Sequence, residues 1–136
     1  MEKKTPVTHY QKALIVGPEV IDRLGHVNNV AYLQWVQEIA GEHWYHCVPQ
    51  AVDELVYWVV LHHSISYRKP CFVHDHLTIK TAIADDESGP KWGRHVWIYR
   101  EDHLAVEAFT TWCLMDRKTN RPRRISGEIT DVFRPR

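Results

Sequence analysis

The side chains best suited to chemistry gather in residues 22–29, directly before the clearest helical pattern in the chain. A helix N-terminus offers unpaired N–H donors and the positive end of the helix dipole, which together can polarise a carbonyl group and stabilise an oxyanion. A carboxylate beside it could attack the carbonyl carbon or take a proton from an attacking water. The residue types alone leave a simpler interpretation open, in which this segment only caps the helix. The members that could act are Asp22, His26, Asn28 and Asn29.

A helix is predicted over residues 30–48, because apolar side chains recur there at helical spacing. Asn28 or Asn29 can cap its start, and Pro49 ends the pattern. Trp35 falls on the polar side of this predicted helix, so we expect a loop or a second subunit to cover its indole ring. The residues predicted to share the buried face are Val30, Leu33, Val36, Ala40, Trp44, Cys47 and Val48.

Alternating apolar and polar residues predict five strands, and most of these strands are joined by short turns. Short turns imply antiparallel neighbours. A last helical turn is expected over residues 126–133. The predicted strands cover residues 10–16, 57–68, 76–84, 92–100 and 104–116. In the second strand, one face is predicted to carry Tyr57, Val59, Leu61, His63, Ile65 and Tyr67, and in the fifth, Leu104, Val106, Ala108, Thr110, Trp112 and Leu114.

The lengths of these elements suggest how they fit together. The helix would be about 28 Å long and the strands about 30–43 Å, so long twisted strands can wrap the helix. This predicts an α+β domain of the hotdog type, with one long central helix wrapped by a curved antiparallel sheet of roughly five strands. The 136 residues predict a single domain over 1–136. Open sheet edges and strand aromatics such as Trp58, Trp97 and Trp112 lead us to expect edge pairing between two chains.

The composition is that of an ordinary globular protein and narrows the possible partners. The 17 basic and 17 acidic residues balance, which gives no electrostatic reason to bind nucleic acid. The three cysteines and ten histidines form no disulfide framework and no metal motif, so neither a metal nor another cofactor is expected. The N-terminus lacks the apolar core of a signal peptide, and no apolar run is long enough for a membrane span. We therefore expect a cytoplasmic protein without membrane partners.

Three stretches of the chain resemble the 4-hydroxybenzoyl-CoA thioesterase family, and in particular the acyl carrier protein thioesterases and the bacterial long-chain acyl-CoA thioesterases. Asp22 falls where this family carries its catalytic aspartate. Together the stretches cover nearly the whole chain. The helix-start motif is Gly25, His26, Val27, Asn28, Asn29, Val30, Tyr32, Trp35 and Glu38. The second stretch is Ile65, Tyr67, Arg68, Lys69, Pro70, Asp75 and Leu77, and the third runs from Ala105 to Pro122.

The resemblance implies the hotdog fold, active sites between two subunits, and hydrolysis of acyl-CoA or acyl carrier protein thioesters. Carried over by position, Asp22 would be the nucleophile or general base. The backbone N–H near Asn29 would bind the thioester oxygen, while His26 and Asn28 would position the substrate, the water or the carboxylate. A purely structural role for His26 and Asn28 stays equally open. The implied assembly is a homodimer or a tetramer built from dimers.

Further residues are candidates for substrate contact. Tyr32, Trp58, His63 and Tyr67 could line an acyl tunnel. The run 117–124 contains five cations and no anion, and its Arg121 and Arg123 could hold the phosphates of the carrier. A solvated turn is the alternative interpretation of that run.

Three positions near the site leave roles open. The chain has Leu24 where plant relatives carry asparagine, and Gln37 where many bacterial relatives carry glutamate, although Glu38 is retained. These departures leave the proton route open. Cys71 follows Pro70 and is expected to be a structural cysteine at a strand end rather than a nucleophile.

Two other functions remain alternatives to thioester hydrolysis. An enoyl-thioester hydratase would use the same fold with an aspartate and a histidine, but Leu24 occupies its asparagine position and residues 26–29 follow the thioesterase pattern. A non-catalytic acyl-CoA-binding hotdog module would bind the thioester without turnover. Release of free thiol separates hydrolysis from both.

Overall fold

The computed structural model describes residues 8–133 of the chain. Each predicted strand, the long helix and the last helical turn lie within one residue of their expected ends. The short helix α2 and a 3-10 turn at Pro18–Val20 were not predicted, because neither is long enough to show a period. The elements in chain order are β1 (Tyr10–Ile15), α1 (Asn29–Cys47), α2 (Gln50–Asp53), β2 (Val56–Tyr67), β3 (His76–Ile83), β4 (Lys91–Arg100), β5 (His103–Asp116) and α3 (Gly127–Phe133).

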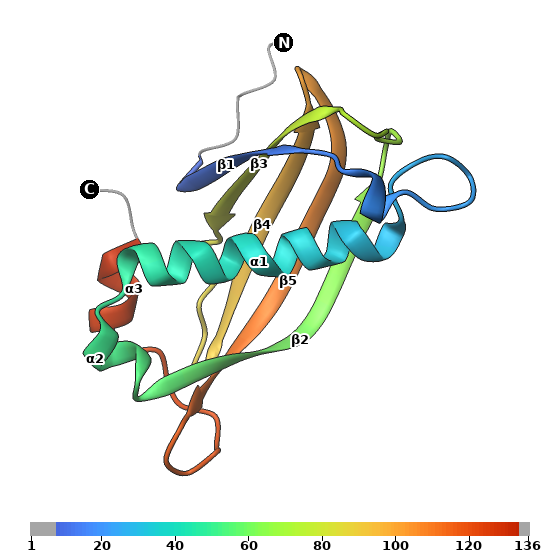
Figure 1. The fold of residues 1–136 in the computed structure, drawn as a ribbon. Helices are drawn as coiled ribbons and strands as arrows, with labels where there is room; N and C mark the ends of the chain where they lie inside the picture. Colours follow the sequence, from blue (N-terminus) through green and yellow to red (C-terminus); the bar gives the residue numbers. More distant parts are fainter. Residues whose placement is uncertain (1–7, 134–136) are drawn as a thin grey trace.

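The five strands form one antiparallel sheet in the order β1-β3-β4-β5-β2. The sheet curves around α1, which crosses its concave face (Figure 1). This arrangement confirms the predicted α+β hotdog fold. Because β1 and β2 are the outer strands, the sheet has two edges in one chain, and the 12-residue β2 is the longer of them.

The alternation predicted for the second strand is wrong beyond its middle, because β2 contains a bulge. The register with β5 shifts between Val60 and His62, so Leu61 is the extra residue. Before the bulge Trp58 pairs with buried Leu114, and after it His63 pairs with buried Thr110. Trp58 and His63 therefore both face the helix, although simple alternation placed them on opposite faces. The predicted face of β5 is correct from Val106 to Leu114, where Val106, Ala108, Thr110 and Leu114 are all buried. It is wrong for Leu104, because the register with β4 shifts between Ile98 and Tyr99 and Leu104 pairs with Tyr99.

The buried face of α1 is rotated relative to the predicted one. Val30 is 70% exposed, whereas Trp35 is buried by its own chain, with its ring packed edge-on against Tyr32. Trp35 therefore needs no second subunit to cover it, and loop residues such as Val27 and Cys71 belong to the same buried cluster. Helix and sheet meet through the side chains Ala31, Tyr32, Trp35, Val36, Ile39, Ala40, His43 and Trp44.

The interior consists of two apolar clusters at the two ends of α1. One surrounds Val36 and Ile39 and packs them against strands β3, β4 and β5. The other surrounds Trp44 and includes α3, whose Ile129 and Phe133 cover the C-terminal end of α1. These clusters hold α1 in place, so the loop before its N-terminus is attached to a rigid element.

Trp58 and Trp112 are half-buried and lie on the helix side of the sheet, not on its open outer face. Both line a cavity on the helix side of the sheet. Trp97 lies on the other face, where its ring stacks on His95 at a centroid distance of 5.3 Å.

Candidate active site

The loop before α1 is closed by its own backbone. An antiparallel bridge joins Ile21 to Val27, and within it the Asp22 N–H donates to the His26 carbonyl at 3.0 Å. The Gly25 N–H donates to the Asp22 carbonyl, and Gly25 has a φ of 84°, a left-handed conformation that glycine adopts without steric cost. The glycine of the motif therefore serves the turn that brings residues 22 and 26 together.

Within residues 8–133, the Asp22 carboxylate accepts a hydrogen bond at one oxygen and none at the other. Its Oδ1 accepts a hydrogen bond from the Leu24 N–H at 2.9 Å, and its Oδ2 lies 3.8 Å from Nδ1 of His26. The two side chains are 27% and 33% exposed, so both can be reached from solvent. Because the turn fixes the orientation of the carboxylate, Oδ2 can accept a proton or attack an electrophile without first reorganising.

The helix begins directly after this loop. Asn28 is the N-cap, and its Oδ1 accepts from the Val30 N–H at 2.8 Å, as one of the two predicted capping residues. Asn29 is the first helical residue and is exposed. Among residues 8–133, no acceptor is bonded to the Asn29 N–H. This N–H can therefore donate to a carbonyl oxygen, at the positive end of a 19-residue helix.

A cavity of about 340 Å³ adjoins the loop and the start of α1. It brings together four residues that the sequence singled out from separate segments, namely His26, Asn29, Tyr32 and Tyr67. The rings of Tyr32 and Tyr67 lie 5.6 Å apart, and the Tyr32 hydroxyl accepts from the Cys71 N–H at 3.2 Å. Burial raises the pKa of Tyr32, so its hydroxyl stays protonated. The complete lining is His26, Val27, Asn29, Tyr32, Tyr67, Arg68, Lys69 and Pro70.

Arg68 and Lys69 also line this cavity, although phosphate recognition was predicted for Arg121 and Arg123. Both side chains are exposed, and Arg68 Nη2 donates to Glu107 Oε2 at 2.8 Å. Cations at the mouth of a cavity suit a phosphorylated ligand. In the sequence, Arg68 and Lys69 stand side by side at the end of a predicted strand, directly before Pro70. They belong to the second stretch that resembles the family, but no role was predicted for them.

Cys71 is completely buried beneath the same cavity. Burial raises the pKa of its thiol, which therefore stays protonated and unreactive. The structure agrees with the structural role expected for this cysteine.

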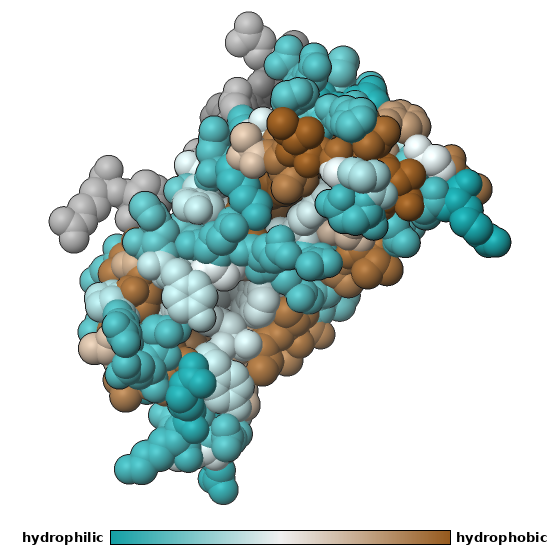
Figure 2. Space-filling view, in the orientation of Figure 1, coloured by the Kyte–Doolittle hydropathy of each residue, from teal (hydrophilic) through white to brown (hydrophobic). Residues whose placement is uncertain are grey.

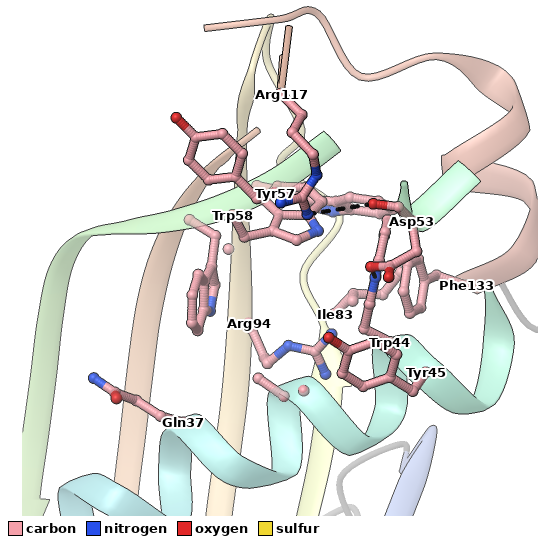
Figure 3. Close-up of a pocket in the computed structure, with 15 residues that line it drawn as sticks. Gln37, Trp44, Tyr45, Asp53, Tyr57, Trp58, Ile83, Arg94, Arg117 and Phe133 are labelled. Atoms are coloured by element: carbon pink, nitrogen blue, oxygen red, sulfur yellow. Dashed lines mark hydrogen bonds between the residues drawn. The ribbon is translucent and has the colours of Figure 1, made fainter. Parts of the chain in front are cut away.

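Four of the predicted substrate contacts lie away from Asp22 within one chain, namely Trp58, His63, Arg121 and Arg123. Trp58 faces the second cavity, near the C-terminal half of α1 (Figure 3). His63 lies between the two ends, where its Nδ1 is 2.8 Å from Thr110 Oγ1 and its Nε2 is 3.4 Å from Gln37 Nε2. Burial and then His62 lower the pKa of His63. Trp58 thus lines one cavity, whereas Tyr32 and Tyr67 line the other.

The basic run lies at the opposite end of the fold from Asp22. Arg123 Nη1 is 3.5 Å from Asp116 Oδ2, and Asp116 pairs with Val56 at the beginning of β2. Tyr67, which lines the cavity beside Asp22, is at the other end of the same strand. Arg121 and Arg123 therefore do not join the Asp22 site of their own chain.

Within residues 8–133, no group of three or more His, Cys, Asp or Glu side chains is arranged to hold a metal ion. In the same part of the chain, none of the helices combines the length and apolar character needed to cross a bilayer.

Comparisons with solved structures identify the same architecture. A probable thioesterase from Bartonella henselae superposes with a TM-score of 0.73 at 23% identity, covering 86% of this chain and 97% of that one. The probable thioesterase YbaW from Escherichia coli gives 0.75 at 23% identity, covering 90% and 94%. A thioesterase from Thermus thermophilus, complexed with coenzyme A and Zn, gives 0.83 at 16% identity, covering 95% and 98%. At these identities, the likeness shows the shared hotdog fold.

A search of curated proteins finds no significant match. The model of the thioesterase-like superfamily, by contrast, matches residues 16–133, which is most of the chain and includes the whole loop, the long helix and four of the five strands described above. The fold, the aspartate-bearing loop at the start of α1 and this match agree, and the chain belongs to the thioesterase-like superfamily.

Proposed function

We propose that this protein hydrolyses acyl thioesters, releasing a carboxylic acid and a free thiol from acyl-CoA or acyl carrier protein. Membership of the thioesterase-like superfamily supports thioester hydrolysis in general. The observation that carries the specific proposal is the carboxylate of Asp22, held by its turn with one oxygen that accepts no hydrogen bond from residues 8–133, beside a cavity at the start of α1.

In the proposed reaction, the thioester carbonyl lies at the N-terminus of α1. The N–H of Asn29 and the helix dipole stabilise the oxyanion as the carbonyl carbon becomes tetrahedral. Asp22 either takes a proton from the attacking water or attacks the carbon itself. In both routes the tetrahedral intermediate collapses by cleavage of the C–S bond, and the thiolate leaves and takes up a proton. Attack by water gives the carboxylic acid directly, whereas attack by Asp22 leaves an acyl anhydride on Asp22 that water then hydrolyses. His26 orients the carboxylate from 3.8 Å away.

The carrier is proposed to approach past Arg68 and Lys69, whose charges suit the phosphates of coenzyme A or of a phosphopantetheine arm. The Thermus thermophilus protein of the same fold was solved with coenzyme A, which supports a coenzyme A thioester as one substrate type. The rings of Tyr32 and Tyr67 would contact the first part of the acyl group.

The direct test is a thiol-release assay with acyl-CoA thioesters of increasing chain length and one aromatic acyl-CoA. We expect a free thiol and a carboxylic acid in equal amounts from at least one member of the series. The same preparation is incubated with crotonyl-CoA, and hydration of its double bond is followed separately. Hydration without thiol release would replace the proposal with a hydratase, and tight binding without turnover would replace it with a binding module.

We further propose that two chains pair along β2. A twofold axis aligns the edge strand antiparallel to its copy, so that its Val56 end lies beside the partner's Tyr67 end. The basic loop, residues 117–124, which lies at the Val56 end, would then approach the Asp22 site of the partner. Figure 2 shows apolar surface along the course of β2, which supports a buried contact there.

Sedimentation velocity tests this pairing. We expect a species of twice the chain mass for the wild type, and a shift toward monomer for Leu61→Arg, because Leu61 is 50% exposed on the β2 edge. Ile15→Arg is the matched control, since Ile15 is 60% exposed on the other edge strand. A monomeric wild type, or equal behaviour of the two variants, would contradict pairing along β2.

A further inference from the structure

A second cavity, of about 270 Å³, lies between the C-terminal half of α1 and strands β2, β4 and β5 (Figure 3). Aromatic rings form a large part of its wall, among them those of Trp44, Trp58, Trp92, Trp112 and Phe133. Its size is below the roughly 300–1,000 Å³ of sites for drug-sized ligands, so it fits a small molecule. Nothing in the proposed reaction at Asp22 uses this cavity.

A buried cation, Arg94 on β4, forms part of the cavity wall. Arg94 is 7% exposed, and in Figure 3 its side chain lies among the ring side chains of the cavity. Among residues 8–133 its two hydrogen bonds both start from Nη1, at 2.9 Å to His43 Nδ1 and 3.1 Å to Thr81 Oγ1. A guanidinium has five N–H donors, so with respect to these residues Nη2 and Nε can still donate to an acceptor in the cavity.

The two protein partners of Arg94 carry no compensating charge. Burial, followed by the charge of Arg94 itself, lowers the pKa of His43 to about 3, so the imidazole is neutral at physiological pH. Among residues 8–133, no carboxylate forms an ion pair with Arg94. A buried cation without a counterion is costly, and a bound anion offsets that cost.

The other polar groups of the cavity determine which charge of ligand it favours. Trp112 lines the cavity, and its indole Nε1 is buried with no hydrogen-bond partner in the described chain. The one carboxylate in the lining, Asp53, accepts the Trp44 indole N–H at 2.7 Å. A second cation, Arg117, lies in the lining and donates to the Val56 carbonyl at 2.9 Å. With two cations, one anion and an unpaired donor, the cavity favours a negatively charged ligand.

We propose that this cavity binds a small carboxylate with an apolar, preferably aromatic, body, and that the carboxylate pairs with Arg94. A planar carboxylate matches the forked geometry of a guanidinium, and the apolar body would replace water against the indole rings. Two sources have this chemistry: a free carboxylic acid, or an acyl group whose thioester lies at the Asp22 site of a chain paired along β2 and whose far end carries a second carboxylate. The binding site itself is independent of the proposed thioesterase activity.

Calorimetric titration of the full chain with benzoate tests the site, with benzamide as the neutral molecule of the same shape. We expect saturable benzoate binding, and affinity for benzamide at least about 10-fold lower because the ion pair is absent. Arg94→Met is expected to lower benzoate affinity by at least about 10-fold. Arg100→Gln is the control on the same strand, because Arg100 contacts Pro70 and Asp75 outside the cavity.

A second variant tests the location without removing the charge. Gly41 lines the cavity, and a Cβ added there meets no atom within 4 Å, so Gly41→Leu is expected to fold and to obstruct the space. It should abolish benzoate binding while Arg94 is still present. Equal affinity for benzoate and benzamide, no saturable binding, or undiminished binding by Arg94→Met and Gly41→Leu would overturn the proposal.

Turnover then separates the two sources. If the carboxylate belongs to the acyl group, Arg94→Met raises the KM for glutaryl-CoA and leaves the KM for pentanoyl-CoA unchanged. If the ligand is a free acid, the variant loses benzoate binding and changes neither KM. Absence of all thioesterase activity would remove the function proposed for Asp22 and leave the calorimetric result for the cavity standing.

Discussion

Replacing Asp22 by alanine or by asparagine is expected to lower the rate of thiol release by at least about 100-fold, the low end for loss of a general base. The reason is that no carboxylate lines the cavity at the start of α1 within residues 8–133, which leaves Asp22 in the adjoining loop as the candidate base. Asparagine keeps an oxygen that can accept the Leu24 N–H, so the turn should survive while the charge is lost. The measurement is kcat and KM for the best acyl-CoA found in the panel.

The matching control is Asp102→Asn, in the exposed turn between β4 and β5, which should leave kcat unchanged. Circular dichroism and thermal unfolding of Asp22→Asn should match the wild type, which separates lost chemistry from lost fold. Full activity in a pure preparation of Asp22→Ala would reject Asp22 as the catalytic group, whatever the substrate.

The second large effect is on stability in acid. The ordinary pKa of a histidine is 6.5, but burial and then Arg94 hold the pKa of folded His43 at about 3. Between these two pKa values, His43 is protonated in the unfolded chain and neutral in the folded chain. The free energy of unfolding therefore falls as the pH drops through this window. From pH 6.5 to 4.5 this single group should remove about 2 kcal/mol from the free energy of unfolding.

The prediction is measured by urea unfolding of wild type and His43→Gln at several pH values between 7 and 4. Glutamine can still accept the Arg94 N–H, but it cannot be protonated, so the variant should lose about 2 kcal/mol less than the wild type over the same interval. His103→Gln replaces an exposed histidine and should follow the wild-type curve. Parallel curves for wild type and His43→Gln would show that His43 is protonated in the folded protein.

Local features were predictable because neighbouring residues determine them. Asn28 caps α1 through a hydrogen bond to the N–H two residues later, and Gly25 adopts a left-handed turn that few other residues tolerate. The strands and the long helix show their periods in the sequence, and their lengths and short connections sufficed to predict the hotdog arrangement. The aspartate-bearing loop and its place before the helix followed in the same way.

The faces of the elements were less predictable, because they depend on the elements that pack against them. The bulge at Leu61 brings Trp58 and His63 to the same face, and it exists only in the register between β2 and β5. The position of Trp35 beside Tyr32 depends on the direction from which the sheet reaches α1. Neither the bulge at Leu61 nor the position of Trp35 is specified by the residues next to it in the sequence.

The order of the elements, the fold class, the turn at residues 22–26 and the cap on α1 follow from the amino-acid sequence, because hydrogen bonds and periodicities between near neighbours specify them. Three other features are set by long-range packing: Arg68 and Lys69 adjoin the Asp22 site, Arg121 and Arg123 lie at the far end of β2, and Arg94 contacts His43. The last pair is 51 residues apart. Such contacts are set by the curvature of the sheet around one helix, a property of the whole packed chain that no short segment contains.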